Sequence, residues 1–180
     1  MCVARACHLK TNEKALFRGA NTSHRTEFVH RWAQSKEVGV GFSMCLLQYS
    51  QYQPGSVKKK IHIEQQLHYR YLICLEGSDK ASGLQWMLAS NSAVLMPPPT
   101  VESWLIESRL EPWVHFIPIK AEGTDLEERL TWAKSHSAAC RRITAASTDY
   151  VMGNPYYSDP ARNAELEREV AAWFLAHTSS

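Results

Sequence analysis

Residues 71–118 alternate short apolar runs with longer amphipathic segments, and this alternation constrains the fold more than any other feature. Residues 71–75 and 93–96 are continuous apolar runs of strand length, which is typical of parallel strands that are covered on both faces. Residues 112–119 are predicted to form a third strand. Between the first two strands, residues 81–88 carry apolar side chains at helical spacing. The block therefore predicts an α/β fold with a Rossmann-like, doubly wound parallel sheet.

The first apolar run ends in Glu76 and Gly77, and Ser78 or Asp79 is predicted to cap the helix that follows. In such a sheet the helix begins at the carboxyl edge of the strands, with its free backbone N–H groups directed there. Anions bind at helix starts of this kind. The pattern therefore indicates a phosphate-binding site beside Gly77.

A second strand–turn–helix unit is predicted nearer the N-terminus, with a strand at residues 15–17 and a helix from about residue 24. Arg18 lies in the turn and Arg25 lies at the helix start. An arginine in the first turn opposes the helix dipole unless an anion is nearby. Two interpretations of Arg25 stay open, an anion ligand and a solvent-facing side chain.

The connections around these units are less sharply patterned. Residues 38–43 are predicted to form a third short strand, and residues 44–56 a loop that ends in Pro-Gly. Residues 61–69 fit either a short helix or the approach to the next strand. The basic run at residues 58–60 is expected on a solvated loop or a strand edge rather than in a binding patch.

Three prolines at residues 97–99 end the strand at residues 93–96, because proline cannot donate ladder hydrogen bonds. Thr100 is then predicted to cap a helix that contains Glu102, Trp104 and Leu105. Glu102 would lie in its first turn, where a carboxylate favours the helix dipole. Its alternative role is to accept hydrogen bonds from sugar hydroxyls, as acidic residues at nucleotide-binding sheets do.

The C-terminal third is predicted to be helical. Residues 124–127 form a capping-box sequence, residues 143–150 continue in a second helix, and Asp159 with Pro160 starts a terminal helix. We expect that helix to dock on the same domain through Leu166, Val170, Trp173 and Phe174. The sequence thus divides into a frayed segment at residues 1–13, a Rossmann-like domain at 14–153, and a docked helix at 154–180.

Composition narrows the class of protein. The 180 residues are 44% hydrophobic and 21% charged with a net charge of +2, as expected of one globular domain and not of a nucleic-acid-wrapping surface. The five cysteines include no CxxC pair and are expected to be reduced. Cys2, Cys7 and His8 lack a second ligand pair, so no metal site or cofactor is predicted. Without a membrane-length apolar run or a signal peptide, a cytoplasmic location is expected.

Several motifs together resemble glycosyltransferase family 90. They are FRGANTSHR at residues 17–25, YLICLEGS at 71–78, LASNSAVLMP at 88–97, LEPWVHFIPI at 110–119 and TDLEERLTWAKSH at 124–136. The resemblance implies a GT-B architecture of two Rossmann-like domains, with a nucleotide-sugar donor bound by the C-terminal one and inversion at the anomeric carbon. The phrases LEGSDKASGLQWMLASNS and MPPPTVESW look most like the bacterial lipopolysaccharide branch of the family.

The resemblance also implies roles for individual residues. Arg18, Gly19 and the small polar residues to Thr22 match the arginine-glycine turn of the family. Arg25 matches the arginine that contacts the donor diphosphate. Gly77 matches the glycine at the donor-facing end of a strand.

Further matches are looser. Glu102 is similar to the acidic residue near the donor ribose. The protein-modifying branch carries a second diphosphate arginine six residues after the glycine that Gly77 matches. This chain has Gly83 at that position. Lys80 is expected to supply that charge as a less directional donor, and Ser82 on the same segment completes the expected donor-binding set.

In the family the acceptor domain and its catalytic aspartate precede the arginine-glycine turn, whereas here 16 residues precede that motif. The catalytic residues are therefore left unassigned. The first hypothesis is a glycosyltransferase that moves a sugar from a UDP-sugar to lipopolysaccharide core or a related glycan. The alternative is a truncated or non-catalytic nucleotide-sugar-binding fragment without the acceptor domain. An unrelated Rossmann-type nucleotide binder is disfavoured, because no complete dinucleotide fingerprint is present.

Overall fold

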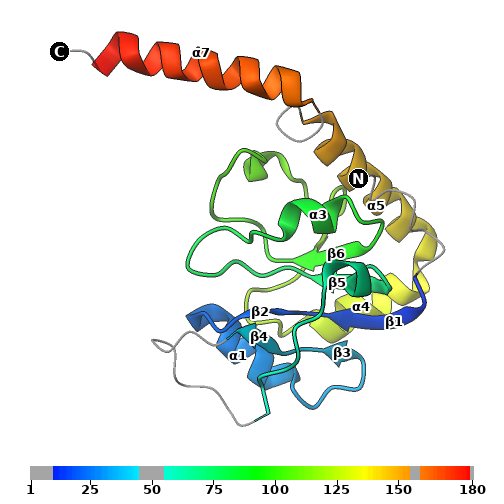
Figure 1. The fold of residues 1–180 in the computed structure, drawn as a ribbon. Helices are drawn as coiled ribbons and strands as arrows, with labels where there is room; N and C mark the ends of the chain where they lie inside the picture. Colours follow the sequence, from blue (N-terminus) through cyan, green and yellow to red (C-terminus); the bar gives the residue numbers. More distant parts are fainter. Residues whose placement is uncertain (1–9, 45–54, 155–158, 179–180) are drawn as a thin grey trace.

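The structure is a computed structural model, and it describes residues 10–44, 55–154 and 159–178 (Figure 1). Its main sheet has five strands in the order β3-β1-β5-β6-β7, and every neighbouring pair is parallel. The strands are β1 (Asn12–Leu16), β3 (Val38–Gly39), β5 (Tyr69–Ile73), β6 (Ala93–Met96) and β7 (Ile117–Pro118). Since all five run the same way, their carboxyl ends meet at one edge of the sheet.

Both faces of this sheet are covered, because successive side chains of its strands enter different cores. Tyr71 and Ile73 belong to a core that includes residues of α1 (Ser23–Trp32) and α4 (Leu126–Ser135). Leu72 and Cys74 belong to a second core with α3 (Leu84–Leu88). The expected α/β fold with a Rossmann-like sheet is confirmed, and the continuous apolar runs have the predicted cause.

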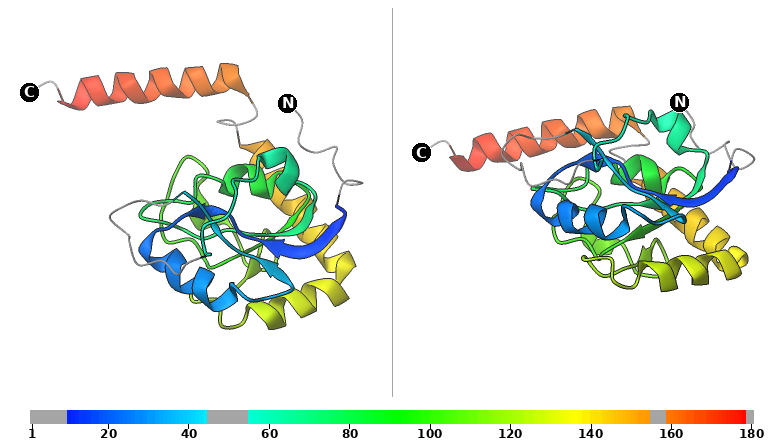
Figure 2. Two further views of the ribbon diagram at one scale, coloured as in Figure 1. Left: turned by 60° about the horizontal axis from the view of Figure 1, so that its bottom comes forward. Right: turned by 90° about the horizontal axis from the view of Figure 1, so that it is seen from below.

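The helix α5 (Ser137–Gly153) joins the two cores at one end of the sheet. Its first half contributes Cys140 and Ile143 to the core of α1 and α4, and its second half contributes Val151 to the core of α3. The views in Figure 2 show α5 following α4 at a sharp corner and continuing along the body. This helix therefore fixes the amino edge of the sheet as well as its faces.

The predicted strand at residues 38–43 is instead two short strands in two sheets. Val38–Gly39 forms β3 of the main sheet, whereas β4 (Phe42–Met44) pairs in parallel with β2 (Gly19–Ala20). Residues 61–69 contain the short helix α2 (Ile63–Gln66) and then enter β5. Most of the loop predicted at residues 44–56 lies outside the described residues.

The helix predicted to start at Thr100 is wrong. The chain bends there and forms only a short 3-10 helix, η4 (Glu107–Arg109), after Ile106. Ile106 has a φ of 58°, a left-handed conformation that interrupts a right-handed helix. Glu102 therefore does not lie in a helical first turn.

Three other boundaries differ from the sequence predictions. The helix α3 begins at Leu84 after Gly83, without a side-chain cap, so neither Ser78 nor Asp79 caps it. The predicted capping box at residues 124–127 does not form, because Asp125 rather than Thr124 is the N-cap of α4 and no side chain caps the helix. The third strand is shorter than predicted, since Trp113 has a φ of 67° and the ladder begins at Ile117.

The terminal helix α7 (Pro160–Thr178) starts as predicted, with the Asp159 carboxylate accepting the N–H groups of Ala161 and Arg162 at 3.0 Å each. Figures 1 and 2 show it extending away from the body. It has no buried residue, and Trp173 and Phe174 are 63% and 57% exposed. The expected docking of this helix is therefore not observed.

At the other end of the chain, β1 begins at Asn12, so residues 12 and 13 are part of the sheet rather than frayed. Residues 1–9 of the expected frayed segment lie outside the described residues. Among the helices that the structure describes, none combines the length and the apolar character that a membrane crossing requires. The proposed division of the chain into a domain and two appendages stays a prediction.

Candidate functional site

Two cavities open at the carboxyl edge of the sheet, on either side of the segment that follows β5. The first, which we call the arginine cavity, has a volume of about 250 Å³ and is lined by Arg18, Gly19, Arg25 and Ser82 among others. The second, the proline-lined cavity, has a volume of about 270 Å³ and is lined by residues 76–80 and 97–101 among others. Cys74, Leu75 and Ala81 line both. The cavities are therefore adjacent.

Arg25 ties the start of α1 to the end of β5. Its Nη2 donates to the Leu75 carbonyl oxygen at 2.7 Å and its Nε to that of Glu76 at 3.2 Å. The guanidinium also lies 5.9 Å from the centre of the Phe17 ring, within range of a cation–π interaction. A side chain held by two strand-end carbonyls keeps one orientation, so its positive charge is fixed at this edge.

Gly19 and Gly77 leave the space that the Arg25 guanidinium occupies. A Cβ atom at Gly77 would lie 3.2 Å from Arg25 Cζ and 3.3 Å from Arg25 Nη2. A Cβ atom at Gly19 would lie 3.1 Å from Arg25 Nη1. Because carbonyl oxygens hold the guanidinium, it cannot move aside freely. Both positions therefore need glycine so that the Arg25 guanidinium can lie close to the backbone, whatever ligand binds there.

Arg18 is the second fixed charge of the arginine cavity. Its Nη1 donates to the carbonyl oxygens of Phe17 at 2.7 Å and Gly39 at 2.8 Å. Burial lowers the pKa of both Arg18 and Arg25, and neither forms a salt bridge with a carboxylate in the described part of the chain. The cavity thus holds two partly desolvated positive charges without a counter-ion, which favours an anionic ligand.

Two polar atoms beside these arginines are also unsatisfied. Thr22 is 6% exposed, and its Oγ1 has no hydrogen-bond partner among the described residues. The Arg18 Nε is likewise buried without a partner in this part of the structure. A Cβ atom on Gly77 would lie 3.3 Å from Thr22 Oγ1. Because buried polar groups are rarely left unpaired, these atoms point to a ligand that accepts hydrogen bonds.

Lys80 and Glu102 lie apart from the arginine cavity. With Asp79, Ser103 and Trp104 they line an open depression of about 510 Å³. The Glu102 carboxylate accepts hydrogen bonds from the backbone N–H and the hydroxyl of Ser108, at 3.1 and 2.9 Å. Lys80 also lines the proline-lined cavity but not the arginine cavity. The structure thus brings Arg18, Gly19, Thr22, Arg25, Gly77 and Ser82 together and leaves Lys80 and Glu102 in a separate depression.

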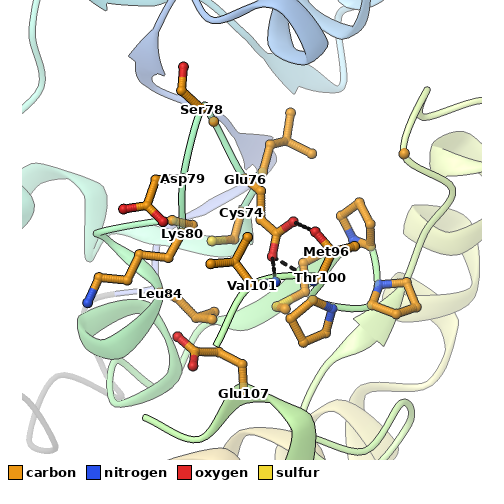
Figure 3. A pocket seen from close by; sticks show the side chains of 17 residues that line it. Cys74, Glu76, Ser78, Asp79, Lys80, Leu84, Met96, Thr100, Val101 and Glu107 are labelled. Atoms are coloured by element: carbon orange, nitrogen blue, oxygen red, sulfur yellow. Dashed lines mark hydrogen bonds between the residues drawn. The ribbon is translucent and has the colours of Figure 1, made fainter. Parts of the chain in front are cut away.

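Figure 3 shows two carboxylates in the proline-lined cavity that the sequence did not single out. Glu76 turns toward Thr100 and accepts its N–H at 2.8 Å and its hydroxyl at 2.5 Å. Glu107 is 4% exposed and accepts the N–H and the hydroxyl of Ser103, both at 2.6 Å. Glu76 follows a buried strand directly, which is a usable signal. The burial of Glu107 depends on loop conformation and has no such signal.

The chemistry available at this edge is anion binding. Two fixed guanidinium groups line the arginine cavity, which suits a phosphate or diphosphate, and the unpaired Thr22 hydroxyl lies near Gly77 outside the lining of that cavity. In the described part of the chain, no group of three histidine, cysteine, aspartate or glutamate side chains is placed to hold a metal ion. Cys74, between the two cavities, is buried, and burial raises its pKa to about 12, so it stays a neutral thiol.

Comparison with known proteins identifies the family to which the chain belongs. The chain is 35% identical over 129 residues to the O-glucosyltransferase LpsA of Dichelobacter nodosus, covering 71% of this chain and 39% of that protein. It is 29% identical over 96 residues to protein O-glucosyltransferase 2 of Danio rerio, covering 53% of this chain and 19% of that protein. It therefore spans about two fifths or less of the length of these relatives. The glycosyl transferase family 90 profile matches residues 4–155, and the chain belongs to that family.

Proposed function

We propose that this chain carries the nucleotide-sugar donor site of a glycosyltransferase and that the arginine cavity holds the donor diphosphate. The observation that carries the proposal is the pair of partly buried arginines, Arg18 and Arg25, held by backbone carbonyls and without a carboxylate partner in the described residues. Fixed positive charge at a strand-end edge is the arrangement expected of a diphosphate site.

The proposed reaction is a single displacement with inversion. An acceptor hydroxyl attacks the anomeric carbon of the sugar, its proton passes to a base, and the bond to the diphosphate oxygen breaks. Arg18 and Arg25 stabilise the negative charge that develops on the departing diphosphate, and the Thr22 hydroxyl donates a hydrogen bond to it. These hydrogen-bonding groups are already oriented before the nucleotide sugar binds, so they reorganise little as negative charge develops on the diphosphate.

The neighbouring residues are proposed to hold the rest of the donor. Gly77 lets the donor approach the backbone between Thr22 and Arg25, and Ser82 offers a hydroxyl in the same cavity. Lys80 extends from the segment between the cavities and adds positive charge from that side. Glu102 accepts hydrogen bonds from ribose hydroxyls in the open depression next to it. This arrangement matches a UDP-sugar in a GT-B enzyme.

The acceptor is proposed to be lipopolysaccharide core or a related glycan, and the reaction is proposed to occur in the cytoplasm. The support is the bacterial character of the LEGSDKASGLQWMLASNS motif together with the 35% identity to LpsA. Because these relatives are O-glucosyltransferases, UDP-glucose is the first donor to test.

The test is a calorimetric titration of the purified chain with UDP, UDP-glucose and, for comparison, GDP. We expect saturable UDP binding with a dissociation constant of about 1 mM or lower. Arg25→Lys should weaken UDP binding at least about tenfold, because lysine cannot span the two carbonyls and the phosphate at once. The matched control is Arg31→Lys, on the exposed side of the same helix.

Two results contradict the proposal. One is a folded chain, shown by a cooperative urea transition, that binds neither UDP nor UDP-glucose. The other is equal UDP affinity in Arg25→Lys and Arg31→Lys. Transfer of radiolabelled glucose from UDP-glucose to lipopolysaccharide core, assayed separately, then tests the acceptor.

A further inference from the structure

A third cavity lies at the amino edge of the sheet, opposite the proposed donor site. We call it the basic cavity. It has a volume of about 170 Å³, and Lys10, Arg70 and Arg141 are among its lining residues. Lys10 precedes β1, Arg70 lies at the start of β5, and Arg141 lies in the first turns of α5. Three separate elements therefore converge their positive charges on one small cavity.

The charges of the basic cavity are only partly neutralised. None of its described lining residues is acidic. Arg70 forms a salt bridge of 3.1 Å with Glu13, which is itself half exposed, and Lys10 Nζ donates to Ser92 Oγ at 2.5 Å. The Arg141 guanidinium has no salt bridge or side-chain hydrogen bond in the part of the chain that the structure describes. The cavity as a whole therefore favours a negatively charged occupant.

The Tyr71 hydroxyl supplies an independent sign of a ligand. Tyr71 lines the basic cavity and is 2% exposed, yet its hydroxyl has no hydrogen-bond partner among the described residues. Burial raises the pKa of Tyr71 to about 12, with Cys140 and Glu13 raising it further and Arg70 lowering it. The hydroxyl thus lies among the residues of the cavity and stays protonated. The hydroxyl oxygen is not one of the fully buried unpaired atoms of the described residues, so it reaches the space of the cavity, where an oxyanion would accept its hydrogen bond.

The start of α5 adds a fifth donor group. Ser137, the first residue of this 17-residue helix, lines the cavity, and the first turn contains no acidic residue and no side-chain cap. Its free N–H groups and the positive end of the helix dipole face the same space as Arg141. The volume of about 170 Å³ is smaller than the 250 and 270 Å³ of the two cavities at the carboxyl edge, which favours a small anion.

We propose that the basic cavity binds a single phosphate group, at a site separate from the donor site and on the opposite edge of the sheet. Arg141 and Arg70 pair with the phosphate oxygens, and the Tyr71 hydroxyl donates a hydrogen bond to one of them. The phosphate is either free in solution or carried by a small sugar. The site does not depend on whether the arginine cavity binds a nucleotide.

The first experiment titrates inorganic phosphate into the chain at constant ionic strength, with acetate as the monovalent comparison, and follows binding by calorimetry. We expect saturable binding at the basic cavity, in addition to any phosphate that the proposed donor site takes up. Arg141→Gln should weaken phosphate binding about tenfold, since it removes a charge-assisted contact. The matched control, Arg142→Gln, changes the next residue of the same helix, which is exposed and does not line the cavity. Its phosphate affinity should match the parent chain.

Two further variants sharpen the test because they are expected to change phosphate affinity in opposite directions. Tyr71→Phe removes only the hydroxyl and should weaken phosphate binding about threefold. Glu13→Gln releases Arg70 from its salt bridge and should strengthen phosphate binding about threefold. A general surface-charge effect would not distinguish Tyr71→Phe from the parent chain.

Repeating the titration with excess UDP separates this site from the donor site. Saturable phosphate binding that persists in excess UDP and is weakened by Arg141→Gln supports a second site, whether or not UDP itself binds. Loss of all saturable phosphate binding in excess UDP, its absence in a folded chain without UDP, or equal losses in Arg141→Gln and Arg142→Gln would each overturn the proposal. Glucose 1-phosphate distinguishes the sources: tighter binding than inorganic phosphate identifies a phosphorylated sugar, and equal binding identifies free phosphate.

Discussion

The two edges of the sheet both present arginines to a cavity, but they hold them in different ways. At the carboxyl edge, Arg25 donates to the carbonyl oxygens of Leu75 and Glu76 and is partly buried. At the amino edge, Arg141 is exposed and has no salt bridge in the described residues, and the Arg70 side chain is 44% exposed. The arginine at the carboxyl edge is therefore fixed and partly removed from solvent, whereas the arginines at the amino edge are more exposed to solvent.

This difference shows how the same residue type serves two binding regimes. An arginine already fixed by carbonyl oxygens loses little conformational entropy when an anion binds, and its charge acts in a medium of lower dielectric constant. An exposed arginine must be ordered by the ligand and is screened by salt. We therefore expect the carboxyl edge to contribute more to both stability and selective binding.

The largest expected contrast is in stability. Arg25→Ala should lower the free energy of unfolding by about 2–4 kcal/mol, because it leaves strand-end carbonyls unpaired and removes the cation–π contact. Arg141→Ala should change it by about 0.5 kcal/mol or less. Urea denaturation of both variants measures the difference. Equal losses would show that the carbonyl contacts of Arg25 do not stabilise the fold.

The second contrast concerns the two described cysteines. Cys74 is fully buried, and burial raises its pKa to about 12. Burial also raises the pKa of Cys140. Cys140 lines the basic cavity beside Arg141, and the positive charge of Arg141 offsets part of that rise. Because the thiolate is the reactive form, iodoacetamide at pH 8 should modify Cys140 about tenfold faster than Cys74.

Peptide mapping by mass spectrometry separates the two thiols, and urea-unfolded protein gives the reference rates. The Cys74 rate should rise as the pH approaches 12, since the thiolate fraction grows until the folded-state pKa is reached. Faster modification of Cys74 than of Cys140 in the folded chain would show that the carboxyl edge is open to solvent.

The third contrast uses two glycines. Gly77→Ala places a Cβ atom 3.2 Å from Arg25 Cζ, so the guanidinium must shift, and UDP affinity should fall about fivefold to tenfold. The matched control is Gly153→Ala at the end of α5, where a Cβ atom has nothing within 4 Å. Calorimetry with UDP measures both variants. Unchanged affinity in Gly77→Ala would mean that the donor does not need the present position of Arg25.

The smallest expected effect separates binding from stability at one atom. Thr22→Val removes a buried hydroxyl that has no hydrogen-bond partner among the described residues. The free energy of unfolding should therefore stay within about 0.5 kcal/mol of the parent value or rise. UDP affinity should fall about threefold, because the bond to the diphosphate is lost. A large loss of stability would instead indicate that the hydroxyl is satisfied in the folded chain.

The sheet was predictable from sequence, and the site was predictable in part. The apolar runs at residues 71–75 and 93–96 gave two central strands, because a strand covered on both faces needs apolar side chains on both. The helix predicted after Thr100 failed, since Ile106 takes a left-handed conformation and the distant Glu76 carboxylate accepts the backbone N–H groups of Thr100 and Val101. A local sequence pattern cannot predict hydrogen-bond partners that lie far away in the chain.

The same limit applies to the site residues. The motif around Arg18 and Arg25 indicated an anion site, and the structure brings these arginines together with Thr22 and Gly77. It separates Lys80 and Glu102 from them, because α3 begins at Leu84 and the segment after Gly77 is a loop rather than a helix. The position of a loop side chain is set by contacts that the sequence pattern does not specify.

The sequence by itself determined the parallel α/β sheet and the edge at which its polar turns collect, because strand length, burial and turn residues are local properties. The tertiary structure alone decided that Arg25 would be anchored by carbonyls about fifty positions away, and that Lys10, Arg70 and Arg141 would meet around Tyr71. Charges and hydrogen bonds of that kind depend on distances in space, which chain order does not fix until the core has packed.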